Sequence, residues 1–192
     1  MVAAFLKAEY SSPRFKDDLK KAMQSLAVDE AVITYADTTS KRENELRARV
    51  LGEYRGYRQN REMFEGLPNN LTWYEAELRR DEIGELWYVD YSYWNELTDH
   101  THLVKDAVSN IQKGKIVFNV SNDRFLTVAK KIARGKHDFE PMILWGWDIT
   151  SPLEILEGHL RATAFGLAGE KAPTTIKVLI GLLNLPESFR FI

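Results

Sequence analysis

One short segment of the chain carries residue types that could bind a phosphate. It reads Glu157-Gly158-His159-Leu160-Arg161, and the pattern around it predicts a strand that turns at glycine directly into a helix. The first turn of a helix has unpaired backbone N–H groups at the positive end of the helix dipole, which attracts anions. Glycine also lets a ligand approach the backbone closely. The segment therefore predicts an anion site that suits a nucleotide phosphate.

Four side chains in and beside this turn could act on a bound phosphate. Arg161 could form a bidentate pair with it, and we expect its side chain to be partly exposed. His159 is placed where it does not serve the core, so it could donate a proton to the phosphate. Glu157 could hold a magnesium ion or act as a general base, and we take Glu157 and His159 as the candidate catalytic residues. Thr163 could add a hydroxyl to the site, or it could satisfy a local carbonyl group.

Short alternating elements surround the turn from residue 115 onward. The patterns predict strands at 116–120, 142–147, 153–156 and 174–183, with helices starting at Ser121 or Asn122 and at His159. The chain in front of them is predicted to be mainly helical, with helices at 13–26, 40–58, 72–78 and 103–111. The N-caps are expected at Ser12, Ser40, Thr72 and Thr101, and residues 87–94 fit either a strand or the start of a helix. We therefore expect an α+β protein with a helical region at 1–114 and a small α/β-like module at 115–192.

The module resembles the ParB/sulfiredoxin-like domain over roughly residues 115–183, in the order of its elements and in its Gly-His-x-Arg turn. That family includes the N-terminal domain of a partition protein, sulfiredoxin and a free-serine kinase. The resemblance implies a mixed-sheet domain on which the N-terminal helices pack. It also implies that ATP, ADP or CTP rests its phosphates on the helix start. The residues that it places around the nucleotide are Gly158, His159 and Arg161, with Asn119, Ser121 and Asn122 lining the pocket.

The chain departs from the family's patterns in ways that limit its chemistry. Sulfiredoxin has a cysteine at the position of His159, and this sequence contains none, which excludes sulfinic acid reduction by that route. Partition proteins have an acidic residue there followed by two arginines, and Leu160 replaces the first of them. Leu160 also replaces the second histidine of the kinase-type members. These departures argue against a CTP clamp of the partition type.

Composition sets the remaining limits. The 192 residues include 44% hydrophobic and 28% charged side chains, with a formal net charge of −2. This composition predicts a folded protein. The chain has no overall positive charge that would attract nucleic acid or anionic membranes, so DNA binding would need a local basic patch. Cationic side chains at the end of the helix that starts near 122 are predicted to be a solvated face: Lys130, Lys131, Arg134 and Lys136. The absence of cysteine favours a reducing cytoplasm, and no apolar run approaches the roughly 20 residues of a membrane span.

These observations predict a nucleotide-binding protein that transfers a phosphoryl group to an unknown small acceptor or hydrolyses the nucleotide, assisted by magnesium. The alternative is a non-enzymatic partner protein of a plasmid or phage that senses a nucleotide or binds DNA. No membrane partner is expected. His100 and His102 lack further ligands nearby in sequence and do not predict a metal site.

Overall fold

The structure is a computed structural model that describes residues 1–136 and 138–183. The chain folds as two compact units, Met1–Asn70 and Leu71–Ile192. The sequence predicted a division near residue 114, and the observed one falls after residue 70. The reason is β1 (Thr72–Arg79), which pairs along its whole length with β4 (Thr175–Leu182). Residues between 72 and 114 therefore belong with the C-terminal module.

Unit 1 is helical in its described structure. Its elements are α1 (Val2–Tyr10), α2 (Lys16–Ser25), α3 (Ala31–Thr34), α4 (Lys41–Arg55) and the 3₁₀ turn η1 (Glu62–Phe64). The predicted cap of α4 is confirmed, because the Ser40 Oγ accepts a hydrogen bond from the Glu43 N–H at 3.3 Å. The predicted cap at Ser12 is wrong. Residues 12–15 form a turn in which the Ser12 carbonyl accepts from the N–H groups of Phe15 and Lys16, and α2 begins only after it.

A buried arginine connects the elements of unit 1. The Arg47 side chain, on α4, is fully buried and donates to the Val32 carbonyl at 2.8 Å and to the Asp37 carbonyl at 2.6 Å. It also pairs with Glu43 at 3.0 Å and donates to the Asn44 Oδ1 at 2.7 Å. Charged donors are tolerated in a core when their hydrogen bonds are satisfied. Arg47 thereby joins α4 to α3 and to the loop that follows α3.

Unit 2 contains a four-stranded mixed sheet in the order β1-β4-β2-β3. The two inner strands, β2 (Met142–Gly146) and β4, are parallel. The outer strands β1 and β3 (Glu154–Glu157) run antiparallel to their neighbours. The mixed sheet together with the surrounding helices gives the α+β fold that the sequence predicted.

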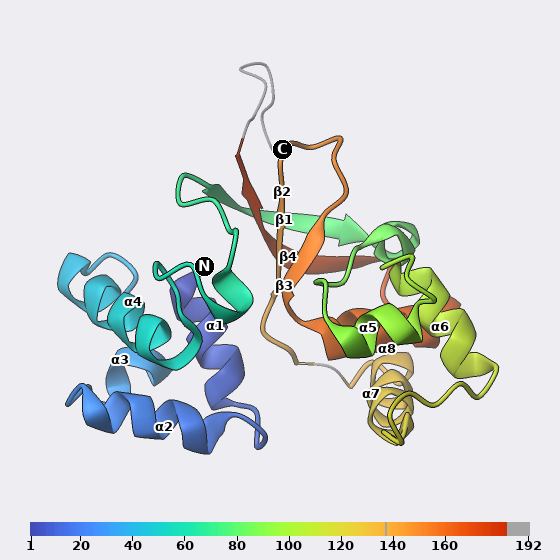
Figure 1. Cartoon of the computed structure of the whole chain (residues 1–192), viewed down its shortest axis with the longest axis horizontal. Helices are drawn as coiled ribbons and strands as arrows, with labels where there is room; N and C mark the ends of the chain where they lie inside the picture. The colour runs from blue at the N-terminus through green and yellow to red at the C-terminus, as the bar shows by residue number, and fades with distance from the viewer. Residues whose placement is uncertain (137, 184–192) are drawn as a thin grey trace. The chain divides into compact units, whose positions relative to one another are not determined.

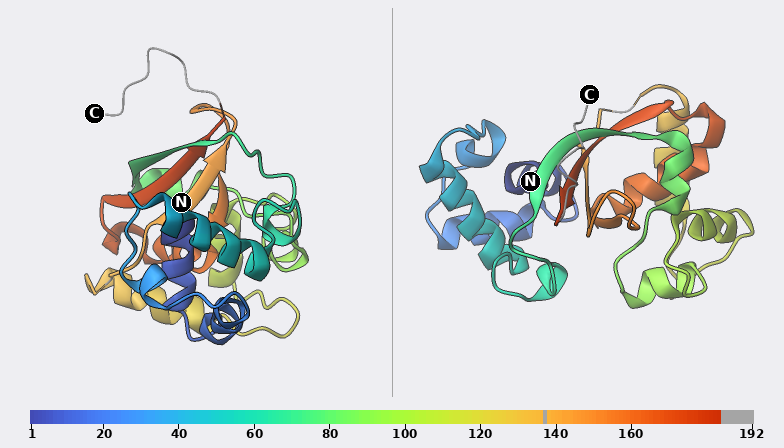
Figure 2. Two further views of the ribbon diagram at one scale, coloured as in Figure 1. Left: turned by 90° about the vertical axis from the view of Figure 1, so that its left-hand side faces the viewer. Right: turned by 90° about the horizontal axis from the view of Figure 1, so that it is seen from above.

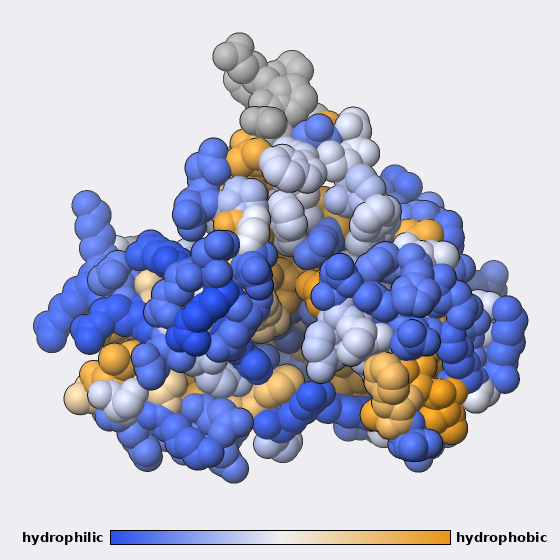
Figure 3. All heavy atoms as spheres, viewed as in Figure 1, coloured by the Kyte–Doolittle hydropathy of each residue, from blue (hydrophilic) through white to orange (hydrophobic). Residues whose placement is uncertain are grey.

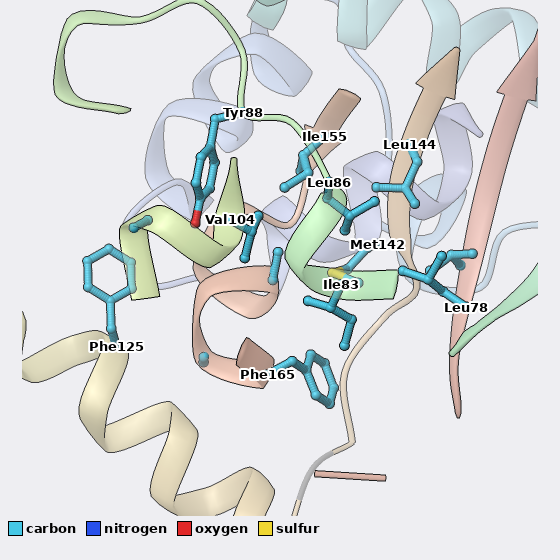
Figure 4. Close-up of a cluster of buried hydrophobic side chains, with 14 of the residues drawn as sticks. Leu78, Ile83, Leu86, Tyr88, Val104, Phe125, Met142, Leu144, Ile155 and Phe165 are labelled. Atoms are coloured by element: carbon cyan, nitrogen blue, oxygen red, sulfur yellow. The ribbon is translucent and has the colours of Figure 1, made fainter. Parts of the chain in front are cut away.

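Helical elements lie to one side of this sheet (Figures 1 and 2). They are η2 (Arg80–Glu85), α5 (Ser92–Leu97), α6 (Val104–Gln112), α7 (Asp123–Ala133), α8 (His159–Ala168) and η3 (Gly169–Lys171). Side chains of both layers form the buried core (Figure 4), among them Leu78, Met142, Leu144 and Ile155 from the strands and Ile83, Val104 and Phe165 from the helices. α8 packs against both α6 and α7.

Most elements of the C-terminal module were predicted from the sequence. Strands β2, β3 and β4 and helix α8 are confirmed, α8 with both ends as expected. The helix predicted at 72–78 is wrong, because that segment is β1. The strand predicted at 116–120 is also wrong, because these residues form a tight turn closed by a single bridge between Val117 and Val120. Residues 87–94 combine both alternatives, with bridges at Trp87 and the start of α5 at Ser92.

Within the residues described, no helix is both long enough and apolar enough to cross a membrane.

Candidate functional site

The strand-glycine-helix turn predicted at 153–168 is present. β3 ends at Glu157, Gly158 has φ +113°, and α8 begins at His159. A Cβ atom on Gly158 would lie 2.8 Å from the Cγ of Met142, so glycine is required by both the backbone angle and the space. No side chain caps the helix at this end. The turn therefore has the local geometry expected of an anion site.

Arg161 is less exposed than the sequence suggested. Its residue exposure is 8%, and its guanidinium donates to the Glu140 carbonyl and forms an ion pair with the Glu157 carboxylate. Glu157 is the last residue of β3 and Arg161 lies in the first turn of α8, so this ion pair spans the turn at Gly158. Burial lowers the pKa of Arg161 to about 10, against the opposing effect of the Glu140 charge. Arg161 thus remains a cation at neutral pH and is already partly neutralised by Glu157.

His159 packs among aromatic rings, although we expected it to stay clear of the core. Its ring is nearly parallel to that of Trp94, with centroids 5.4 Å apart, and to that of Tyr88, at 6.0 Å. Its Nε2 is buried and has no hydrogen-bond partner in the part of the chain that the structure describes. Burial lowers the pKa of His159 to about 4. The imidazole is therefore neutral at physiological pH.

A chain of hydroxyl groups fixes the backbone of this turn. The Thr163 Oγ1 donates to the His159 carbonyl at 2.7 Å, which commits its single proton. The Tyr88 hydroxyl lies 2.7 Å from the Thr163 Oγ1. Because the Thr163 proton is already used, the Tyr88 hydroxyl must donate to the Thr163 Oγ1. Burial raises the pKa of Tyr88, which keeps that proton in place. Of the two roles considered for Thr163, the structure shows the second: its hydroxyl satisfies a local carbonyl group.

The three residues predicted to line the pocket ahead of α7 lie in the turn before that helix. Asn119 is exposed with φ +59°, and the Ser121 Oγ accepts from the Asp123 N–H at 3.1 Å. The Asn122 Nδ2 donates to the Lys115 carbonyl at 2.7 Å. α7 packs on α8, and its Phe125 lies 6.1 Å from Trp94. No hydrogen bond between described residues joins these three side chains to the turn at Gly158.

A pocket of about 210 Å³ lies against the side of α8. Its walls come from α8, from the segment leading into β2 and from the start of β4: Asp138, Phe139, Glu140, Met142, Arg161, Phe165, Pro173, Thr175, Ile176 and Lys177. Lys177 is exposed and forms no ion pair with any described residue. Arg161 and Lys177 thus give the pocket two cationic side chains.

Of the charged residues that line the pocket, only Arg161 was predicted from the sequence. Lys177, Asp138 and Glu140 were not. Lys177 lies inside the apolar run of β4, where no motif marks it, and only the pairing of β4 with β2 brings it to the pocket. Asp138 and Glu140 are similarly placed by the fold. Tyr88 and Trp94, whose rings stack on His159, were not among the predicted site residues.

The described residues contain no group of three or more histidine, aspartate or glutamate side chains that could hold a metal ion by itself. Two carboxylates, Asp138 and Glu140, line the pocket. Mg²⁺ commonly binds through one or two carboxylates together with substrate phosphates. The pocket therefore fits magnesium that arrives with a phosphate ligand.

No protein-family model, no curated protein and no solved structure matches the chain.

Proposed function

We propose that unit 2 binds the phosphate end of a nucleotide, such as ATP, ADP or CTP, in the pocket beside α8. One observation carries the proposal: the buried Arg161 and the exposed Lys177 line the same small pocket. The turn residues Glu157, Gly158 and His159 are not among the residues that line it. Cationic donors of this kind form the strongest hydrogen bonds to phosphate oxygens. A nucleotide as ligand agrees with the cytoplasmic location that the sequence suggests.

The size of the pocket indicates which part of a nucleotide it would hold. At about 210 Å³ it is smaller than the roughly 300–1,000 Å³ of sites that enclose a whole small-molecule ligand. A phosphate group or short phosphate chain would fit, with the nucleoside outside. Phe139 lines the pocket with 37% of its surface exposed, and aromatic side chains can stack on nucleotide bases. We therefore place the phosphates near Arg161 and Lys177 and the base near Phe139.

Ligand binding and the Glu157–Arg161 pair must compete. Arginine carries five N–H donors, and Arg161 uses its terminal nitrogens for the Glu140 carbonyl and the Glu157 carboxylate. A phosphate that approaches the guanidinium meets the negative charge of Glu157. Binding would therefore weaken the ion pair or displace Glu157 from it. Lys177 forms no ion pair with a described residue, although Asp138 and Glu140 line the same pocket and Glu77 is its neighbour on β1.

Magnesium would supply charge neutralisation for phosphoryl transfer when bound with the nucleotide. Asp138 and Glu140 are the residues that would hold it. A phosphoryl transfer to a small acceptor, or hydrolysis, is the activity we propose for the filled site. His159 is neutral, and its ring is stacked on Trp94, so its proposed part is to position the helix start.

A thermal-shift panel tests the proposal. ATP, ADP, CTP and GTP are each added with and without magnesium, because a ligand that binds only the folded state raises the unfolding temperature. We expect at least one nucleotide to stabilise the protein, and the corresponding nucleoside to have no effect. Equal shifts with nucleotide and nucleoside, or no shift with any nucleotide at millimolar concentration, would contradict the proposal.

A further inference from the structure

One segment of unit 2 is strongly basic in a chain that is weakly acidic overall. Between Lys113 and Lys136 the sequence contains seven lysines and arginines and one acidic residue, Asp123, against a net charge of −2 for the whole chain. The cations are Lys113, Lys115, Arg124, Lys130, Lys131, Arg134 and Lys136. Only Lys115 forms an ion pair with a described residue, to Asp99 at 2.5 Å. The other six are exposed and leave a local positive field.

The same segment exposes large apolar side chains. Ile116, Phe118 and Val120, in the turn before α7, are 61%, 62% and 48% exposed, and Leu126 on α7 is 40% exposed. Figure 3 shows an apolar area where Figure 1 places α7 and this turn. We call these four residues with the six exposed cations the basic-apolar surface. The sequence analysis predicted a solvated face from the cations at the end of this helix and did not consider the exposed apolar side chains beside them.

Two residues of the turn before α7 have left-handed backbone angles. Phe118 has φ +49° and Asn119 has φ +59°. The left-handed region suits asparagine and glycine and is unfavourable for a bulky aromatic residue. An exposed phenylalanine at such a position gains nothing from the core of its own unit. The arrangement therefore suits a role outside that core.

α7 presents both kinds of side chain on its outer side. Phe125, Ala129 and Ile132 face the core, whereas Arg124, Leu126, Lys130 and Lys131 are exposed. The apolar face of α7 is buried in the core, and Leu126 is the exposed large apolar residue of this helix, one helical turn from Lys130. The turn at 116–120 adds three apolar side chains ahead of it.

We propose that the basic-apolar surface docks on an anionic lipid bilayer, without crossing it. The sequence analysis, which considered the overall charge of −2, did not expect a membrane partner. Lysine and arginine side chains are attracted to the negative surface of such a bilayer, and the exposed apolar side chains can enter the boundary between headgroups and acyl chains. Nucleic acid would use the same cations, but the aliphatic side chains of Ile116, Val120 and Leu126 cannot stack on bases as aromatic rings do. The combination of charge and aliphatic residues therefore favours lipid.

Vesicle sedimentation of the full chain tests the proposal. The vesicles are phosphatidylcholine alone and phosphatidylcholine mixed with phosphatidylglycerol. We expect the protein to sediment with the mixed vesicles, to stay in solution with the neutral ones, and to bind less as salt is raised. Failure to sediment with the mixed vesicles at low salt would overturn the proposal, as would binding only to duplex DNA in a parallel retardation assay.

Two variants separate the apolar and the charged contributions. Phe118→Asn removes the ring and suits the left-handed backbone, so the fold is retained, and we expect binding to fall about tenfold. Lys130→Glu with Lys131→Glu should reduce it by about a hundredfold or more. The controls alter unit 1 alone: Tyr35→Asn, at a residue 85% exposed, and the exposed pair Lys41→Glu with Arg42→Glu. Phe118→Asn binding as tightly as Tyr35→Asn would overturn the proposal.

Discussion

Arg161 is a buried cation whose charge is shared between a partner on its own chain and an adjoining pocket. This position makes Glu157 a competitor of any anionic ligand. Glu157→Gln removes the competing charge while keeping the size of the side chain. We expect nucleotide affinity to increase several-fold, because the guanidinium becomes available without breaking an ion pair. Titration calorimetry of the variant against the exposed control Glu170→Gln measures the effect, and weaker binding by Glu157→Gln would count against this view of the pair.

His159 makes the stability of the protein depend on pH. Its pKa is lowered by burial from 6.5 to about 4, so between these values the unfolded chain takes up a proton that the folded one excludes. The stabilisation from excluding this proton is complete above pH 6.5 and is lost as the pH falls toward 4. His159→Phe keeps a ring beside Trp94 and does not titrate. Relative to wild type, we expect it to gain up to about 3 kcal/mol of stability between these pH values.

Chemical denaturation at a series of pH values measures this gain. His100→Gln, which removes an exposed imidazole, is the control for the loss of a histidine. Parallel stability curves for wild type and His159→Phe across the acidic range would show that the imidazole is accessible to solvent and titrates normally.

At the scale of elements, local signals predicted the turn at Gly158 and the helix that follows it. The glycine, the run of small and apolar residues after it and the apolar strands on both sides all belong to one short stretch of sequence. β1 could not be found in this way, because Thr72 with Glu75 imitates a helix cap and the strand is stabilised by β4, about a hundred residues later. Burial of Arg161 was missed for a similar reason. Its partner at Glu140 lies in a different segment.

Gly158 provides a test of how tightly the turn is packed. Gly158→Ala places a Cβ against the Met142 side chain at φ +113°, whereas Gly114→Ala, at φ +84°, meets nothing within 4 Å. Both variants carry the backbone penalty of a positive φ, of about 1 kcal/mol. We expect Gly158→Ala to lose roughly 1–3 kcal/mol more than Gly114→Ala in denaturant unfolding. Equal losses would mean that Met142 moves aside freely.

At the scale of the whole molecule, the boundary between the units decides which fragments can fold. A fragment starting at Leu71 keeps β1 and α6, and one starting at Lys115 lacks both. Without β1, the neighbouring strand β4 loses its antiparallel partner, and the core loses Val104, Ala107 and Ile111. We expect the 71–192 fragment to unfold cooperatively and the 115–192 fragment to lack a transition. Circular dichroism melting of both fragments checks this, and a cooperative 115–192 fragment would restore the boundary that the sequence suggested.

We propose above that the pocket lined by Arg161 and Lys177 holds a phosphate. Lys177 gives the cleanest test, because it is exposed and its loss leaves no buried charge behind. Lys171, an exposed lysine in η3 that does not line the pocket, is the matched control. The decisive measurement is calorimetric titration of wild type, Lys177→Ala and Lys171→Ala with the nucleotide that stabilises the protein most. We predict about a tenfold weaker affinity for Lys177→Ala and an unchanged affinity for Lys171→Ala; equal affinities for all three proteins would contradict the claim.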